Sequence, residues 1–257
     1  MPQSPRQING VWVRQYGDPS DFDTIVIMDS QGRGPCDYPR NYLAIPKVLI
    51  LSISGGTVAH AIRLMSSSFA ARANFIILGG LGTNDLGQKT PPTPAPPRVE
   101  QVVGPRGRQR LEFGGPTVNT QAPKGKYSDL LRDLKRAYNE KRHYQKFVTF
   151  TPFARRSPGP INYHISLLDS RIESFGPDHF HIKTLSYYSA LNQGKRKIYG
   201  GKRPTKDTLY DGDNIHLKPG EVDKFLYCLQ ETRSRLRTGT LTPDRRFTTE
   251  PKFRVKF

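Results

Sequence analysis

Widely separated polar segments of the chain carry the side chains that acyl-transfer chemistry requires. Ser30 follows a β-branched run, and Asp213 and His216 stand three residues apart much later in the sequence. A serine hydroxyl becomes a nucleophile when a neighbouring imidazole accepts its proton, and a carboxylate holds that imidazole in the required tautomer. Asp213 and His216 can point the same way from a single turn. We therefore take Ser30, His216 and Asp213 as a candidate catalytic triad.

The same chemistry needs hydrogen-bond donors for the oxyanion of a tetrahedral intermediate. The candidates are the backbone N–H of Ser30, the backbone N–H of Gly55 and the side-chain amide of Asn84. Because Gly56 follows Gly55 directly, the donor assignment could shift by one residue. Losing one such donor typically raises the barrier by about 3 kcal/mol.

Each of these residues also has an ordinary structural interpretation. An Asp-Ser pair followed by glycine is common in turns, where side-chain oxygens accept from nearby N–H groups. His216 could bond to the backbone at a helix entry, and Asn84 could be a simple turn residue. Asp207 and Asp211 are acidic neighbours, but only Asp213 lies three residues before a histidine.

The elements that would position these segments alternate between apolar strands and amphipathic helices. Five strands are predicted, at 24–28, 47–53, 74–78, 147–151 and 180–185. Helices are predicted after residue 57, after an N-cap at Ser128, over 161–175 and from Pro219. Continuous apolar runs are typical of strands buried on both faces of a parallel sheet. The prediction is an α/β fold, a three-layer α/β/α sandwich with a mainly parallel five-stranded sheet.

In a parallel sheet, all strand carboxyl ends lie along one edge, which is where α/β proteins place their chemistry. Ser30, Gly55 and Asn84 follow the first three predicted strands, and Asp213 and His216 follow the fifth. We therefore expect the candidate residues to meet in one crevice.

The segments together resemble the SGNH (also called GDSL) hydrolase family, which is named for four dispersed blocks carrying Ser, Gly, Asn and His. The matching segments are Asp29-Ser30-Gln31-Gly32-Arg33, Ser54-Gly55-Gly56-Thr57-Val58, Gly82-Thr83-Asn84-Asp85 and Asp213-Asn214-Ile215-His216. The resemblance spans residues 21–236 in the family's order. It implies a flavodoxin-like three-layer fold and a serine esterase or acetyl hydrolase that needs no metal or cofactor. The implied substrate is a small ester, such as an O-acetylated sugar or a lipid ester.

The chain departs from the family pattern at three places. Met28 stands where the first block normally has glycine, and Leu81 lengthens the third turn. The insertion over 87–126 has no counterpart in small family members. The Gln-Gly-Arg-Gly run of the first block is similar to SGNH domains encoded by some mobile elements.

Composition bounds the organisation of the 257-residue chain. A hydrophobic fraction of 35% is low for a wholly globular protein and indicates long polar segments. We expect a polar basic arm over 1–20, a hydrolase-like domain over 21–236 with a Pro/Gly-rich basic insertion over 87–126, and a basic flexible tail over 237–257. The two cysteines support neither a disulfide framework nor a metal cluster. With no signal peptide or membrane-spanning run, we expect an intracellular protein, cytoplasmic or nuclear.

A net charge of +18 favours polyanionic partners. The candidate nucleic-acid contacts are Lys195, Arg196, Lys197, Lys202, Arg203, Arg245 and Arg246. The alternative hypothesis is therefore a weakly active or inactive SGNH-fold module that binds RNA or DNA through basic loops and tails, with an affinity that falls steeply as salt rises.

Overall fold

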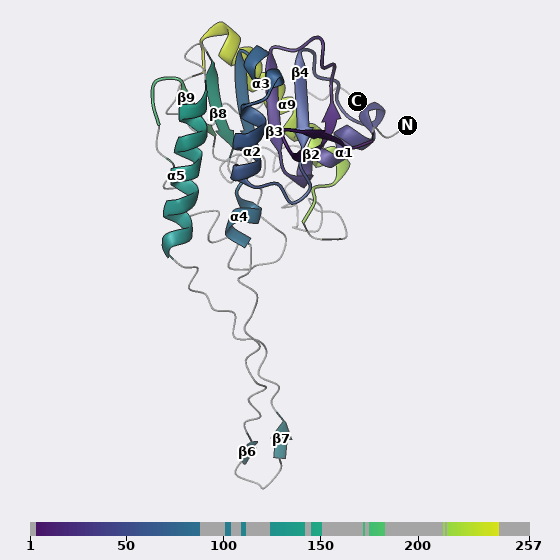
Figure 1. The fold of residues 1–257 in the computed structure, drawn as a ribbon. Helices are drawn as coiled ribbons and strands as arrows, with labels where there is room; N and C mark the ends of the chain where they lie inside the picture. Colours follow the sequence, from purple (N-terminus) through teal and green to yellow (C-terminus); the bar gives the residue numbers. More distant parts are fainter. Residues whose placement is uncertain are drawn as a thin grey trace.

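One mainly parallel sheet, covered by helices on both faces, organises the part of the chain that the structure describes (Figure 1). The structure is a computed structural model. It describes the residues 4–87, 101–103, 109–111, 124–141, 145–150, 172, 175–182, 213 and 215–241, and their side chains except in 101–103, 109–111 and 124–128.

The described sheet has seven strands in the spatial order β1-β2-β4-β3-β5-β8-β9. Their bounds are β1 Arg6–Ile8, β2 Val11–Tyr16, β3 Thr24–Met28, β4 Val48–Ser52, β5 Phe75–Gly79, β8 Lys146–Phe150 and β9 His179–Ile182. The pairs formed among β4, β3, β5, β8 and β9 are all parallel. In chain order these five strands run 2-1-3-4-5, so the connections diverge between β3 and β5. Doubly wound sheets open their crevice beyond the carboxyl ends of the strands at such a switch point.

The five predicted strands are all present, and the sheet carries two more. Residues 6–16, which we expected in a polar arm, form β1 and β2, and β2 pairs antiparallel with β4. Asn9 and Gly10 both have positive φ, as a two-residue hairpin with a type I′ turn requires. Val11 and Val13 are buried while Trp12 between them is exposed, so this hairpin has one core face.

Alternation along the central strands divides the core into two layers. Ile25 and Ile27 of β3 pack in a cluster with the helices on one face of the sheet. Val26 and Met28 pack in the cluster on the other face. Every residue of β3 is buried, which explains the unbroken apolar run in the sequence.

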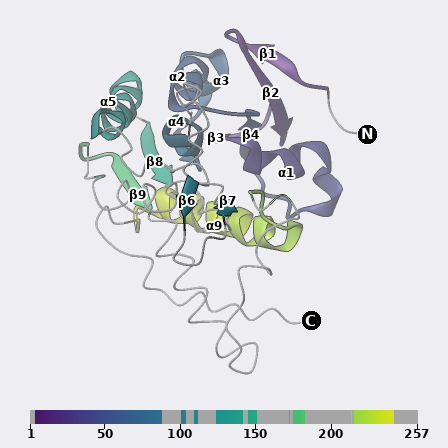
Figure 2. The same ribbon diagram turned by 90° about the horizontal axis from the view of Figure 1, so that it is seen from below.

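Figures 1 and 2 show the two helical layers. On one face lie α2 (Val58–Met65), α3 (Ser68–Arg72), α4 (Thr83–Gly87) and α5 (Lys124–Glu140), and on the other lie α1 (Arg33–Asp37) and α9 (Pro219–Thr238). The short 3-10 helices are η1 (Ser30–Gly32) and η2 (Pro39–Asn41). No helix in the described part of the chain is long and apolar enough to cross a membrane.

Several helix boundaries differ from the sequence prediction. The helix expected after residue 57 is split into α2 and α3, because the Ser67 side chain accepts from the Ala70 N–H and starts a new helix. α5 begins at Lys124, so Ser128 lies inside the helix. Within the insertion, β6 (Gln101–Val103) and β7 (Gln109–Leu111) pair antiparallel. The helix expected over 161–175 lies outside the described residues, apart from 172 and 175.

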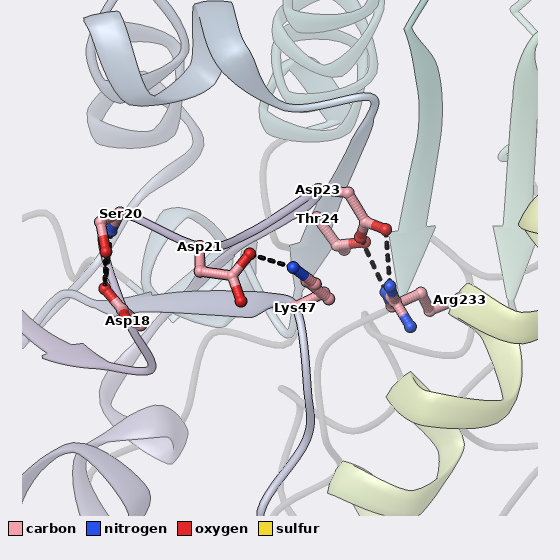
Figure 3. Close-up of polar contacts among 7 residues, drawn as sticks. All are labelled: Asp18, Ser20, Asp21, Asp23, Thr24, Lys47 and Arg233. Atoms are coloured by element: carbon pink, nitrogen blue, oxygen red, sulfur yellow. Dashed lines mark hydrogen bonds and ion pairs between the residues drawn. The ribbon is translucent and has the colours of Figure 1, made fainter.

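An ion pair fixes α9 to the amino end of the sheet (Figure 3). The guanidinium of Arg233 on α9 donates from Nε and Nη2 to the two carboxylate oxygens of Asp23, at 2.7 and 2.5 Å. Burial alone would raise the pKa of Asp23, but the hydrogen bonds from Arg233 and Thr24 and the positive charge of Arg233 outweigh it and lower the pKa. α9 begins at Pro219, shortly after His216, and ends at Thr238, where it is capped by Gly239 with a φ of 67° that suits glycine. The helix therefore runs from the candidate site back to the residue before β3.

Candidate active site

The turn that carries Ser30 is held by its neighbours on both sides. Ser30 starts η1 directly after β3, and the carboxylate of Asp29 accepts from the N–H of Gln31 at 3.0 Å. The backbone oxygen of Asp29 accepts from the hydroxyl of Ser52, at the end of the adjacent strand β4, at 2.9 Å. Asp29 thus orients the turn, while the half-buried Ser30 presents its hydroxyl at the carboxyl edge of the sheet.

The loop before α9 presents His216 through a local hydrogen-bonding arrangement. One carboxylate oxygen of Asp213 accepts from the N–H groups of Ile215 and His216, each at 2.9 Å. The other carboxylate oxygen contacts Nδ1 of the His216 ring. Partial burial alone would raise the pKa of Asp213, but the hydrogen bonds from His216 and Ile215 outweigh it and lower the pKa to about 2. The carboxylate is therefore ionised across the range in which enzymes are assayed.

The two loops meet at the side chains that the sequence singled out. Nε2 of His216 lies 2.8 Å from Oγ of Ser30, although 186 positions separate the two residues in sequence. The Nδ1–H tautomer satisfies both contacts of the ring, because Nδ1–H then donates to Asp213 and Nε2 accepts from the Ser30 hydroxyl. Ser30, His216 and Asp213 form one continuous hydrogen-bonded chain.

The segments that contain Gly55, Gly56 and Asn84 lie against the turn that carries Ser30. The side-chain amide of Asn84 donates to the backbone oxygen of Gly56 at 2.9 Å. A Cβ on Gly56 would stand 3.2 Å from Cα of Asp29, so the glycine loop packs directly on the backbone next to Ser30. Gly56 donates its own N–H to Ile53. Within the described residues no hydrogen bond from the N–H of Gly55 is found.

Asp85 and Thr57 fix the start of α2 beside the glycine loop. Both carboxylate oxygens of Asp85 accept from the Val58 N–H, at 3.3 and 3.2 Å, and burial raises the pKa of Asp85. The Thr57 hydroxyl accepts from the N–H of His60, whose ring faces back to Thr57. Asn84 and Asp85 together therefore hold the segment 54–58 in place.

The side chain of Met28 lies in the core, on the face of the sheet that α9 covers. It is buried in the core layer that also contains Phe225 of α9. Glycines make room for it, because a Cβ on Gly79 would lie 3.0 Å from Cγ of Met28 and one on Gly32 would lie 3.3 Å from its Sδ. The bulk of the Met28 side chain therefore lies in the core rather than beside the Ser30 hydroxyl.

Sequence reasoning missed Gln31. Its side-chain amide donates to the backbone oxygen of Ile215 at 2.8 Å, and its side-chain oxygen accepts from the Leu217 N–H at 3.1 Å. Local sequence offered one signal, since Gln31 sits between a candidate nucleophile and a glycine. Its partners could not be inferred without knowing which loop lies opposite.

The candidate nucleic-acid residues Lys195, Arg196, Lys197, Lys202, Arg203, Arg245 and Arg246 lie outside the described residues. Among the residues that are described, no group of histidine, cysteine or acidic side chains has the arrangement of a metal site. Cys36 and Cys228 are buried free thiols, and burial raises the pKa of Cys36 to about 12.

Comparison with known proteins defines the fold. No family model matches the chain, and no curated protein matches it. Among solved structures, it is similar to a protein from Streptococcus pneumoniae provisionally assigned as a platelet activating factor, with a TM-score of 0.51 and 12% identity over 82% of this chain and 84% of that one. It is also similar to the lipase Lip_vut3 from a goat rumen metagenome, with a TM-score of 0.52 and 12% identity over 82% of this chain and 96% of that one. The chain shares the mixed α/β fold of these proteins.

Proposed function

We propose that the chain is a serine ester hydrolase of the SGNH type, with Ser30 as nucleophile, His216 as general base and acid, and Asp213 as the residue that orients His216. The observation that carries the proposal is the hydrogen-bonded chain from Oγ of Ser30 through the His216 ring to Asp213. The fold shared with a lipase supports it.

In the first half of the reaction, Oγ of Ser30 attacks the acyl carbon of the ester while Nε2 of His216 takes the hydroxyl proton. The carbonyl oxygen carries the negative charge of the tetrahedral intermediate. When the intermediate collapses, the bond to the alkoxy oxygen breaks and His216 gives its proton to the departing alcohol. The acyl group then remains as an ester on Ser30.

In the second half, His216 takes a proton from water as the water oxygen attacks the acyl carbon. Collapse of the second tetrahedral intermediate returns the proton to Oγ of Ser30 and releases the acid. Asp213 stays ionised throughout, because its hydrogen bonds favour the charged form, and it stabilises the imidazolium in both halves.

The proposed oxyanion donors are the N–H of Ser30, the N–H of Gly55 and the side-chain amide of Asn84. Asn84 donates one hydrogen of its side-chain NH2 group to the backbone oxygen of Gly56. This bond fixes the orientation of the side-chain amide and leaves its second hydrogen available for the oxyanion. A donor held in place before reaction needs no reorganisation as charge develops. The proposed substrates are esters with a small acyl group, such as acetyl.

Turnover of p-nitrophenyl acetate tests the proposal. We expect Ser30→Ala to lower kcat/KM by at least about 10³-fold, because the attacking oxygen is removed while the fold is kept. Ser20→Ala, which changes an exposed serine in another loop, serves as the matched control and retains the wild-type rate. Equal turnover by the wild type and the Ser30 variant would reject the proposed catalysis.

A further inference from the structure

We infer that Gln31 is a positioning residue that holds His216 in line with Ser30 by clamping the backbone on both sides of the histidine. The inference deepens the hydrolase proposed above and rests on it. Gln31 is the residue next to the nucleophile, yet its side chain turns toward the loop that carries the base.

The clamp consists of two hydrogen bonds in opposite senses. The Gln31 amide nitrogen donates to the oxygen of Ile215, and the Gln31 side-chain oxygen accepts from the N–H of Leu217. Ile215 and Leu217 are the two chain neighbours of His216, so both peptide units that set the position of the imidazole are fixed to the nucleophile turn. Gln31 is 8% exposed, and water competes little for these bonds.

The loop needs such support. The side chains of His216 and Asp213 are 37% and 47% exposed, and Ile215 between them is also exposed. Within the described residues, the Asp213 contacts are to Ile215 and His216, so they shape the loop locally. Leu217 is buried and anchors the end of the loop, so loss of the clamp would shift the imidazole rather than detach the loop. A displacement of about 1 Å between reacting groups can cost about 10²-fold in rate.

The experiment compares variants of the full-length chain. Gln31→Met keeps the length and burial of the side chain and removes both hydrogen bonds. Gln31→Glu keeps the shape and the acceptor for Leu217, but it places a carboxylate oxygen against the Ile215 carbonyl in place of a donor.

Gln145→Met is the matched control. Gln145 is also buried, and its side chain also bonds to the backbone of another segment. Its amide nitrogen donates to the carbonyls of Ala70 and Ala73 at 2.6 and 2.8 Å. It directly precedes β8, at the amino end of the sheet and away from His216. Loss of the Gln145 hydrogen bonds should lower the thermal stability of the fold while the two hydrogen bonds of Gln31 remain.

We expect both Gln31 variants to lower kcat for p-nitrophenyl acetate by about 10²-fold with KM changed by less than about threefold, because binding is kept and alignment is lost. Gln145→Met should keep the wild-type kcat while lowering the melting temperature. Gln31 variants that fold and keep kcat within about twofold of wild type would overturn the inference, as would an equal loss of kcat in Gln145→Met.

A second readout separates this inference from the proposed function. In crystal structures, the distance from Oγ of Ser30 to Nε2 of His216 should exceed hydrogen-bonding range in Gln31→Met and stay within it in Gln145→Met. If the wild type shows no Ser30-dependent turnover, the hydrolase proposal fails, and this distance still decides the clamp. An unchanged distance in Gln31→Met would refute it.

Discussion

At the scale of single residues, two histidines in different environments contrast a structural imidazole with the one that we propose to be catalytic. His179 is 1% exposed, stacks on Phe175 with ring centroids 4.4 Å apart and accepts from the Phe175 N–H. Its other ring nitrogen lies 2.9 Å from the Thr149 hydroxyl. Burial lowers the pKa of His179 to about 3. His216 is instead only partly buried, with a carboxylate on one ring nitrogen and a serine hydroxyl on the other.

His179 predicts how stability depends on pH. Between about pH 6.5 and the folded-state pKa near 3, the unfolded chain binds a proton on this ring and the folded chain does not. The free energy of unfolding should therefore fall on acidification through this window, by up to about 1.4 kcal/mol per pH unit from this group.

Urea unfolding of the wild type and of His179→Gln at several pH values measures this contribution. The variant should be less stable at pH 7 and should have a flatter acid dependence. Gln145→Met, which removes no titratable group, should shift the profile down without changing its slope. Parallel profiles for the wild type and His179→Gln would show that the ring does not stay neutral in the folded protein.

At the scale of elements, the glycines beside β3 make room for the large side chain of Met28, two residues before Ser30. Met28 pairs with Gly79 across the β3–β5 ladder, and both lie under α9 against Phe225. The large side chain of Met28 is therefore accommodated by a glycine in the neighbouring strand β5.

Gly79→Ala tests this match. The added Cβ would lie 3.0 Å from Cγ of Met28, so we expect a loss of about 1–3 kcal/mol in the free energy of unfolding. In the Met28→Ala background the same change should cost less, because the clashing atom is gone.

Gly220→Ala is the control for this experiment, because its Cβ would meet nothing within 4 Å in the first turn of α9. It should be neutral or stabilising. Equal costs of Gly79→Ala with and without Met28 would contradict the proposed packing.

At the scale of the whole molecule, the strand order explains how distant segments meet. The order 2-1-3-4-5 places the ends of β3 and β5 at the switch point, and the segments after them carry Ser30 and Asn84. α9 then spans one face from His216 back to Asp23, where Arg233 holds it.

The sequence was sufficient for the parallel strands because they are buried on both faces and appear as unbroken apolar runs. It also selected Ser30, Asp213 and His216, whose types and spacing follow from the chemistry. The β1–β2 hairpin could not be predicted in the same way, because only one of its faces is buried and Trp12 between Val11 and Val13 is exposed, so it forms no unbroken apolar run. Gln31 could not be interpreted, because its partners come from a loop 184 or more positions away.

The central claim is that Ser30 is an activated nucleophile, and covalent labelling by a fluorophosphonate tests it most directly. Attack by Oγ forms a bond to phosphorus, fluoride leaves and His216 takes the proton. We predict one adduct that peptide mass spectrometry maps to Ser30, no adduct there in Ser30→Ala, and labelling slowed by at least about 10²-fold in His216→Ala. An intact protein that leaves Ser30 unlabelled, or that labels it equally fast without His216, would contradict the account.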